Sequence, residues 1–85
     1  MKLDNRITEL IAIGASVTAN CQPCLQYHID KALESGASEL EIAQAIEVAK
    51  AVRKGASAKM DQFASTISKT IPSNAGAPTA GCGCS

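Results

Sequence analysis

The chain has 85 residues, enough for one domain. Its charges balance, with eight Lys and Arg against eight Asp and Glu, and no basic stripe marks a surface for nucleic acid or for an anionic membrane. No apolar run approaches the roughly 20 residues that cross a bilayer, and charged side chains stand at the start, where a signal peptide would be apolar. We therefore expect a cytoplasmic protein that binds neither nucleic acid nor membranes.

The apolar part of the composition is rich in alanine. Apolar residues make up 46% of the chain, but there is one Phe, one Tyr and no Trp. Alanine removes little area from water, and a short chain buries a smaller share of its surface than a long one. Domains of this size commonly need disulfides, metals or association. We expect a homo-oligomer whose core is completed between chains.

The first predicted helix covers residues 3–19. Apolar residues recur there at the spacing of one helix face. Gly14 lies on this face and predicts close packing of a neighbouring element, while Asn20 favours a break. The face comprises Leu3, Ile7, Leu10, Gly14 and Val17, and it is widened by Ile11 and Ile13.

A second helix is predicted over residues 22–35. Pro23 fits its first turn, where the missing N–H would have no partner in any case. Gly36 follows as a stop signal. The apolar face of this helix comprises Leu25, Ile29, Ala32 and Leu33.

A third helix begins at a strong start signal. Ser38-Glu39-Leu40-Glu41 has the pattern of a capping box, in which Glu41 reaches back to the cap. Apolar residues continue at helical spacing to Gly55, which weakens or ends the helix. The same spacing resumes beyond it, so a fourth helix or a bent continuation is expected to about Lys69.

No window shows the two-residue alternation of a strand, so the predicted fold is all-α: a small helical bundle over residues 1–71. Residues 72–85, here called the tail, are mostly small and polar and follow a proline that closes the regular part. They cannot bury enough surface to offset the entropy of ordering. We expect the tail to be disordered.

Three chemically active side chains share one predicted helix face. Cys21, Cys24 and His28 stand at i, i+3 and i+7, and the last two are direct neighbours on the helix. A CxxC pair at a helix start favours the thiolate and lets a disulfide form and open reversibly. His28 can accept the thiol proton. This spacing favours thiol–disulfide chemistry.

Other interpretations of these residues stay open. A structural zinc site would need a fourth ligand, which only the tail residues Cys82 or Cys84 could supply. The cysteines could also be inert and buried. His28, taken without the cysteines, could be a packing residue.

Glu9 is a further candidate, because it lies in an otherwise apolar stretch. A carboxylate there could orient His28 and stabilise its charged form. The alternative is an exposed Glu9 that pairs with Arg6 on the same helix, worth a few tenths of a kcal/mol. Spacing alone favours the pairing with Arg6.

The tail carries a second cysteine pair, Cys82-Gly83-Cys84. A disulfide within CxC closes a small strained ring and would be oxidising. One interpretation is a redox relay arm that reaches the CxxC pair of its own or a neighbouring chain. A metal- or sulfur-carrying segment and a free flexible end are the alternatives.

Two stretches of the sequence resemble a known family. Thr8-Glu9-Leu10-Ile11-Ala12 and the run from Ala19 through Cys21-Gln22-Pro23-Cys24 to His28 are similar to the carboxymuconolactone decarboxylase family, in particular to its alkylhydroperoxidase D-like branch. The resemblance covers roughly residues 3–68.

The resemblance implies an all-helical fold that assembles as trimers or hexamers. We expect no cofactor. The resemblance also implies a proton relay in which Glu9 supports His28 and His28 serves Cys24, with Cys21 as the disulfide partner. Pro23 stands where members of that branch can carry a His, and such members are about twice as long. The decarboxylases of the family lack the CxxC, which argues against lactone decarboxylation.

We therefore expect a thiol-dependent oxidoreductase that reduces a peroxide or a disulfide and is itself reduced by a thiol partner. The first alternative is a binding module that carries a metal or sulfur on the CxxC–His face and the CxC tail. The second is a decarboxylase-like enzyme that uses His28 beside inert cysteines.

Overall fold

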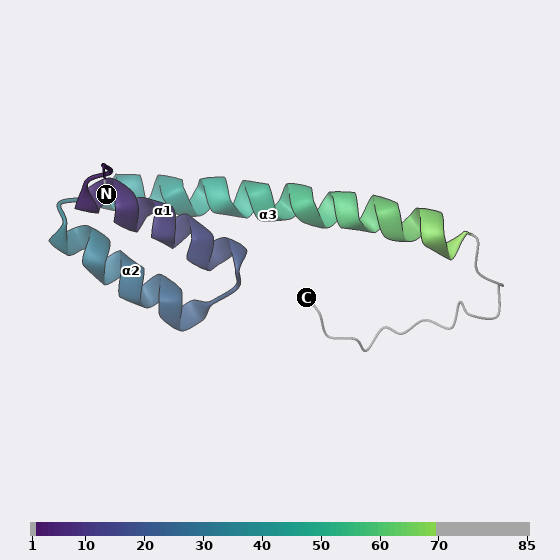
Figure 1. Ribbon diagram of the computed structural model, residues 1–85, viewed down its shortest axis with the longest axis horizontal. Helices are drawn as coiled ribbons and strands as arrows, with labels where there is room; N and C mark the ends of the chain where they lie inside the picture. The colour runs from purple at the N-terminus through teal and green to yellow at the C-terminus, as the bar shows by residue number, and fades with distance from the viewer. Residues whose placement is uncertain (1, 70–85) are drawn as a thin grey trace.

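The computed structural model describes residues 2–69, which form three helices joined by short turns (Figure 1). They are α1 (Asn5–Thr18), α2 (Gln22–Glu34) and α3 (Glu39–Ser68). No strand occurs in this part of the chain. The all-α fold predicted from the sequence is confirmed, whereas the predicted tail lies outside the described residues.

The ends of α1 follow from local signals. Asp4 caps its start by accepting a hydrogen bond from the Ile7 amide at 2.8 Å. After the helix, Asn20 adopts a left-handed backbone with φ of 58°. Asparagine tolerates this conformation better than most residues. The predicted break at Asn20 is therefore where the chain turns into α2.

The C-terminal end of α2 is closed by glycine. Gly36 has φ of 93°, and its amide donates to Leu33 O at 3.1 Å, while the Ala37 amide donates to Ala32 O at 2.9 Å. These two hydrogen bonds form a Schellman motif with Gly36 in the left-handed position. The stop predicted from Gly36 is confirmed.

Helix α3 continues past Gly55, where the sequence predicted that it weakens or ends. Its capping box is present, because Ser38 Oγ accepts from the Glu41 amide and Glu41 Oε1 accepts from the Ser38 amide. The helix then runs without interruption through Gly55. A glycine inside a helix costs about 1 kcal/mol relative to alanine but removes no backbone hydrogen bond. The continuation is thus observed and not a separate fourth helix.

Helix α1 is the centre of the packing. It pairs antiparallel with α2 and runs alongside the first half of α3, whereas α2 and α3 hardly touch (Figure 1). The side chain of Ile13 on α1 is fully buried, with Ala32 and Ile42 around it. Gly14 lies against α3, since an added Cβ would stand 3.9 Å from Ala45 O and from Ala49 Cβ. The neighbour predicted from Gly14 is therefore α3.

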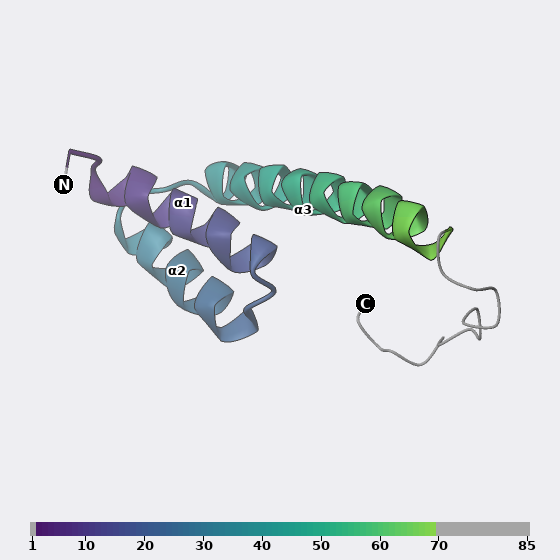
Figure 2. The same ribbon diagram turned by 45° about the vertical axis from the view of Figure 1, so that its right-hand side comes forward.

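The second half of α3 projects beyond the other two helices. Both views show it extending past the ends of α1 and α2 (Figures 1 and 2). Every residue from 50 to 69 is exposed, including Val52, Met60 and Phe63. Within residues 2–69 no helix has both the length and the apolar character that a membrane crossing requires.

Candidate functional site

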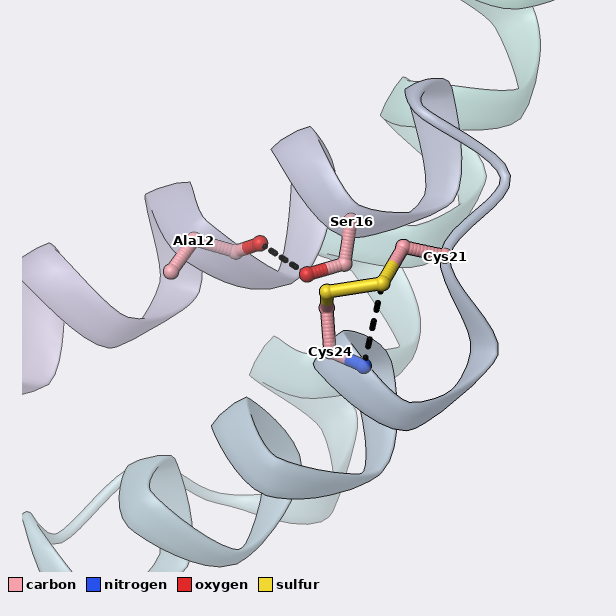
Figure 3. The surroundings of a disulfide bond; sticks show 4 residues. All are labelled: Ala12, Ser16, Cys21 and Cys24. Carbon is pink, nitrogen blue, oxygen red and sulfur yellow. Dashed lines mark hydrogen bonds between the residues drawn. A yellow bond between two sulfur atoms is a disulfide. The ribbon is translucent and has the colours of Figure 1, made fainter.

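The two cysteines of the CxxC motif are joined in a disulfide at the start of α2. The Cys21–Cys24 bond has an S–S distance of 1.98 Å and a Cα–Cα distance of 5.3 Å. Cys21 is the N-cap of α2, and its extended backbone lets Sγ accept from the Cys24 amide at 3.3 Å (Figure 3). Cys24 is exposed and Cys21 is partly buried. The two sulfurs therefore face different surroundings.

Helix α1 lies next to the disulfide. Figure 3 shows Ser16 on the side of α1 that faces the two sulfurs. Its buried hydroxyl donates to Ala12 O at 2.8 Å, and its carbonyl accepts from the Cys21 amide at 3.0 Å. Ser16 thus fixes where the chain enters α2. Ser16 could not be singled out from the sequence, because a small residue on a helix is not a motif.

A carboxylate and an imidazole meet between α1 and α2. Glu9 Oε1 lies 2.7 Å from His28 Nδ1, and both side chains are largely covered, with 21% and 29% of their surfaces exposed. An ionised carboxylate can only accept, so Nδ1 carries the proton in this contact. In the neutral ring Nε2 then keeps its lone pair and can act as a base.

The structure decides between the two interpretations of Glu9. Arg6 pairs with Glu41 of α3 and not with Glu9. The local pairing of Glu9 with Arg6, which spacing favoured, is therefore wrong. A tertiary contact replaces it, because α1 turns Arg6 toward α3 and Glu9 toward α2.

The contacts of Glu41 with Arg6 and Ser38 affect its pKa. The pKa of Glu41 is lowered from its ordinary value of 4.5, chiefly by the hydrogen bond from the Ser38 backbone amide. The charge and the hydrogen bond of Arg6 also lower the pKa of Glu41. This carboxylate thus closes the capping box of α3 and ties α3 to α1.

Tyr27 borders His28 from the exposed side. The two rings meet edge to face, with centroids 5.0 Å apart and planes at 83°. Tyr27 is 57% exposed, and Lys31 Nζ lies 5.7 Å from its ring centre. Tyr27 therefore covers an edge of the histidine without being part of the core.

A small pocket adjoins Cys21 on the side of α3. Its volume is about 200 Å³. Arg53 of α3 borders it and donates from Nη1 to Val17 O and to Asn20 Oδ1, both at 2.9 Å. The sequence could not predict these contacts of Arg53, because one of them joins it to a residue 36 positions away. The lining comprises Ser16, Val17, Asn20, Cys21, Gln22, Leu25 and Arg53.

The remaining predicted site residues are placed as follows. Cys21 is the N-cap of α2, Cys24 lies in its first turn and His28 in its middle, while Glu9 lies on α1. Cys82 and Cys84 lie outside the described residues. Within residues 2–69 no group of three or more His, Cys, Asp or Glu side chains is arranged to hold a metal ion.

The fold and the site define an all-helical protein with a CxxC disulfide at a helix start and a histidine–carboxylate pair beside it. Residues 1–65 match the model of the carboxymuconolactone decarboxylase family, so the chain belongs to that family. The family resemblance found in the sequence is thereby confirmed. No curated protein and no solved structure matches the chain significantly.

Proposed function

We propose that this protein is a thiol–disulfide oxidoreductase of the alkylhydroperoxidase D-like type. The observation that carries the proposal is the Cys21–Cys24 disulfide on the same helix as His28, whose Nδ1 is held by Glu9. A reversible dithiol and a positioned base are the two parts that this chemistry needs.

In the reduced protein His28 Nε2 takes the proton from the Cys24 thiol, directly or through a water. The thiolate is the reactive species. Cys24 is exposed and can meet an oxidant, whereas Cys21 is partly buried. These surroundings support Cys24 as the attacking sulfur and Cys21 as the resolving one.

With a disulfide as oxidant, the Cys24 thiolate attacks one substrate sulfur and the other leaves as a thiolate. Cys21 then attacks Cys24 Sγ, which forms the Cys21–Cys24 disulfide and releases the second substrate thiolate. Two electrons pass to the substrate, and the two protons of the dithiol pass to the two thiolates that leave.

With a peroxide as oxidant, Cys24 attacks an oxygen, the O–O bond breaks, and an alcohol or water leaves. Cys24 becomes a sulfenic acid, which Cys21 attacks with loss of water. Both routes end in the same Cys21–Cys24 disulfide. Pro23 in place of a histidine between the cysteines supports the disulfide route over the peroxide route.

The test is steady-state turnover of the full chain with a peroxide and with a small disulfide, each coupled to a dithiol reductant. Cys24→Ser is expected to abolish turnover with both oxidants. The double variant Cys82→Ser/Cys84→Ser removes two thiols outside the CxxC pair and is the control for general loss of thiols. A change in its turnover would show that the tail takes part as a relay. Full turnover in Cys24→Ser would overturn the proposal.

The same preparation tests the alternative of a metal or sulfur carrier. Elemental analysis of protein purified without added metal is expected to show no stoichiometric metal. A metal bound one per chain in the parent protein and lost in Cys84→Ser would establish the carrier in place of the oxidoreductase.

A further inference from the structure

The pocket beside Cys21 lies at the N-terminal end of α2. Neither Cys24 nor His28 lines it, whereas Cys21 does. Its volume of about 200 Å³ equals roughly seven water molecules at 30 Å³ each, or a molecule of about that many heavy atoms. The pocket therefore gives a small molecule, or the end of a larger one, access to Cys21.

Arg53 brings an uncompensated positive charge to this pocket. Its Nη1 donates both hydrogens, to Val17 O and Asn20 Oδ1, which fixes the guanidinium in place. Within residues 2–69 Nε and Nη2 make no hydrogen bond and Arg53 has no carboxylate partner, in contrast to Arg6. No acidic residue lines the pocket. The free edge of a guanidinium matches the two oxygens of a carboxylate.

We propose that this pocket binds the electron donor, and that the donor is an anionic thiol with a carboxylate within a few bonds of its sulfur. Arg53 is then a specificity-determining residue that receives the carboxylate while the donor sulfur faces Cys21. This inference rests on the proposed function, since it names the partner that reduces the Cys21–Cys24 disulfide.

The reduction balances as follows. The donor thiol loses its proton to water and attacks Cys21 Sγ as the thiolate. The bond between Cys21 and Cys24 breaks, and its electron pair leaves on Cys24 Sγ, which takes up a proton that His28 relays from water. A second donor thiolate attacks the donor sulfur of the mixed disulfide and releases Cys21 as a thiolate, which is then protonated. Two donor thiols become one disulfide, and the protein disulfide becomes two thiols.

A wider hollow of about 1020 Å³ continues from the pocket along α3 and shares Asn20 and Arg53 with it. It gives room for the remainder of a larger donor. Its charges are mixed. Lys50 pairs with Glu47 in its wall, and Lys54 and Asp61 also line it. The selectivity for an anion is therefore assigned to Arg53 alone.

The test compares three small thiols as reductants of the oxidised full-length protein: mercaptopropionate (anionic), mercaptoethanol (neutral) and cysteamine (cationic). Rates are followed by alkylating the freed thiols, and each is expressed per unit of thiolate. Because the ion pair between Arg53 and the donor carboxylate would be exposed, mercaptopropionate is expected to react about three- to fivefold faster than mercaptoethanol. Cysteamine is expected to be the slowest.

Arg53→Gln is expected to abolish this preference, so that the ratio of the rates with mercaptopropionate and mercaptoethanol falls to about one. Arg53→Lys, which keeps the charge but loses the planar fork, should give an intermediate preference. Lys59→Gln is the matched control, because it removes one positive charge from α3 outside both hollows, and it should keep the full preference.

Arg53 also ties α3 to the end of α1, and the ratio of rates separates that structural role from binding. If Arg53 only held α1 in place, Arg53→Gln would change the rates with all three thiols together. A wild-type protein without a preference for the anionic thiol, or an Arg53→Gln variant that keeps it, would overturn the inference. If the protein keeps its preference for the anionic thiol but turns over no oxidant, the proposed function is overturned instead.

Discussion

At the scale of single residues, the contact between Glu9 and His28 matters most. It joins two helices through side chains that are largely covered. In the proposed mechanism it leaves Nε2 of the ring as the base. Tyr27 covers one edge of the same ring. In that mechanism the carboxylate acts through the histidine, so we propose that Glu9 is a positioning residue and not one that touches the substrate.

Glu9→Gln tests this role. The amide keeps the shape and one acceptor but loses the charge. Turnover is therefore expected to fall about tenfold, which is the size of effect expected when a hydrogen bond loses its charged partner. His28→Ala removes the base itself and should cost about a hundredfold. The measurement is kcat/KM with the better oxidant.

Glu47→Gln serves as the control for Glu9→Gln, because Glu47 is an exposed carboxylate on α3 that pairs only with nearby Lys50 in the described part of the chain. Its kcat/KM should equal that of the parent protein. Equal turnover of Glu9→Gln and Glu47→Gln would contradict the role given to Glu9.

At the scale of helices, the ends were predictable because each depends on a few neighbouring residues. The capping box at Ser38, the left-handed Gly36 and the break at Asn20 are all local signals. Gly55 misled, because its modest helix cost is overridden by good helix formers on both sides. The partners of Arg6 and Arg53 could not be predicted, since each contact joins residues far apart in the chain.

Two glycine substitutions should have opposite effects on stability. Gly36→Ala places a side chain in a left-handed backbone and is expected to lower the free energy of unfolding by about 1 kcal/mol. Gly55→Ala meets nothing within 4 Å and should raise it by about 0.4–1 kcal/mol. Urea unfolding of both variants checks the signs; stabilisation by Gly36→Ala would contradict the turn described here.

The link between α1 and α3 predicts a pH dependence. Because the pKa of Glu41 is lowered in the folded state, its ionised form stabilises the fold above its ordinary value of 4.5. That contribution is lost as the pH falls through the lowered pKa. Urea unfolding should therefore show Glu41→Gln less stable than the parent protein at neutral pH, with the difference vanishing in acid.

Glu34→Gln is the control for Glu41→Gln, because it removes an exposed carboxylate on α2 whose partner is Lys31, 3.7 Å away. Its difference from the parent protein should be small at every pH. A difference for Glu41→Gln that grows as the pH falls would have the wrong sign for this account.

At the scale of the whole molecule, the buried core is small, and every residue of α3 from 50 onward is exposed within the described residues 2–69. Six apolar side chains are buried within residues 2–69. An apolar stripe begins beside α1 and continues along the projecting part of α3, and we propose that it is covered by a second copy of the chain. The stripe comprises Val48, Val52, Met60, Phe63 and Ile67.

Association is therefore expected, as trimers or hexamers if the chain assembles as its family resemblance implies. Phe63→Glu places a charge in the stripe, where burial of an aromatic side chain contributes about 1.5–3 kcal/mol. It should shift the protein toward the monomer in analytical ultracentrifugation, whereas Lys59→Gln should not. A parent protein that is monomeric at high micromolar concentration would contradict the proposal.

The sequence could predict the helices, and the family resemblance grouped Glu9 with the CxxC–His pattern, in which the structure shows a Glu9–His28 contact. It could not predict the pocket at Cys21, because α1, α2 and α3 each contribute to its wall. It also could not show that the second half of α3 is exposed within residues 2–69, since its apolar spacing is the same in the packed and projecting halves.

The most direct test is a count of thiols in the fully reduced Cys82→Ser/Cys84→Ser variant after one equivalent of oxidant. We predict the loss of two thiols per chain, joined as Cys21–Cys24 in a peptide map, at a rate that His28→Ala lowers. Recovery of both thiols on adding a thiol reductant completes the cycle. Retention of both thiols, or loss at a rate that His28→Ala leaves unchanged, would contradict the central claim.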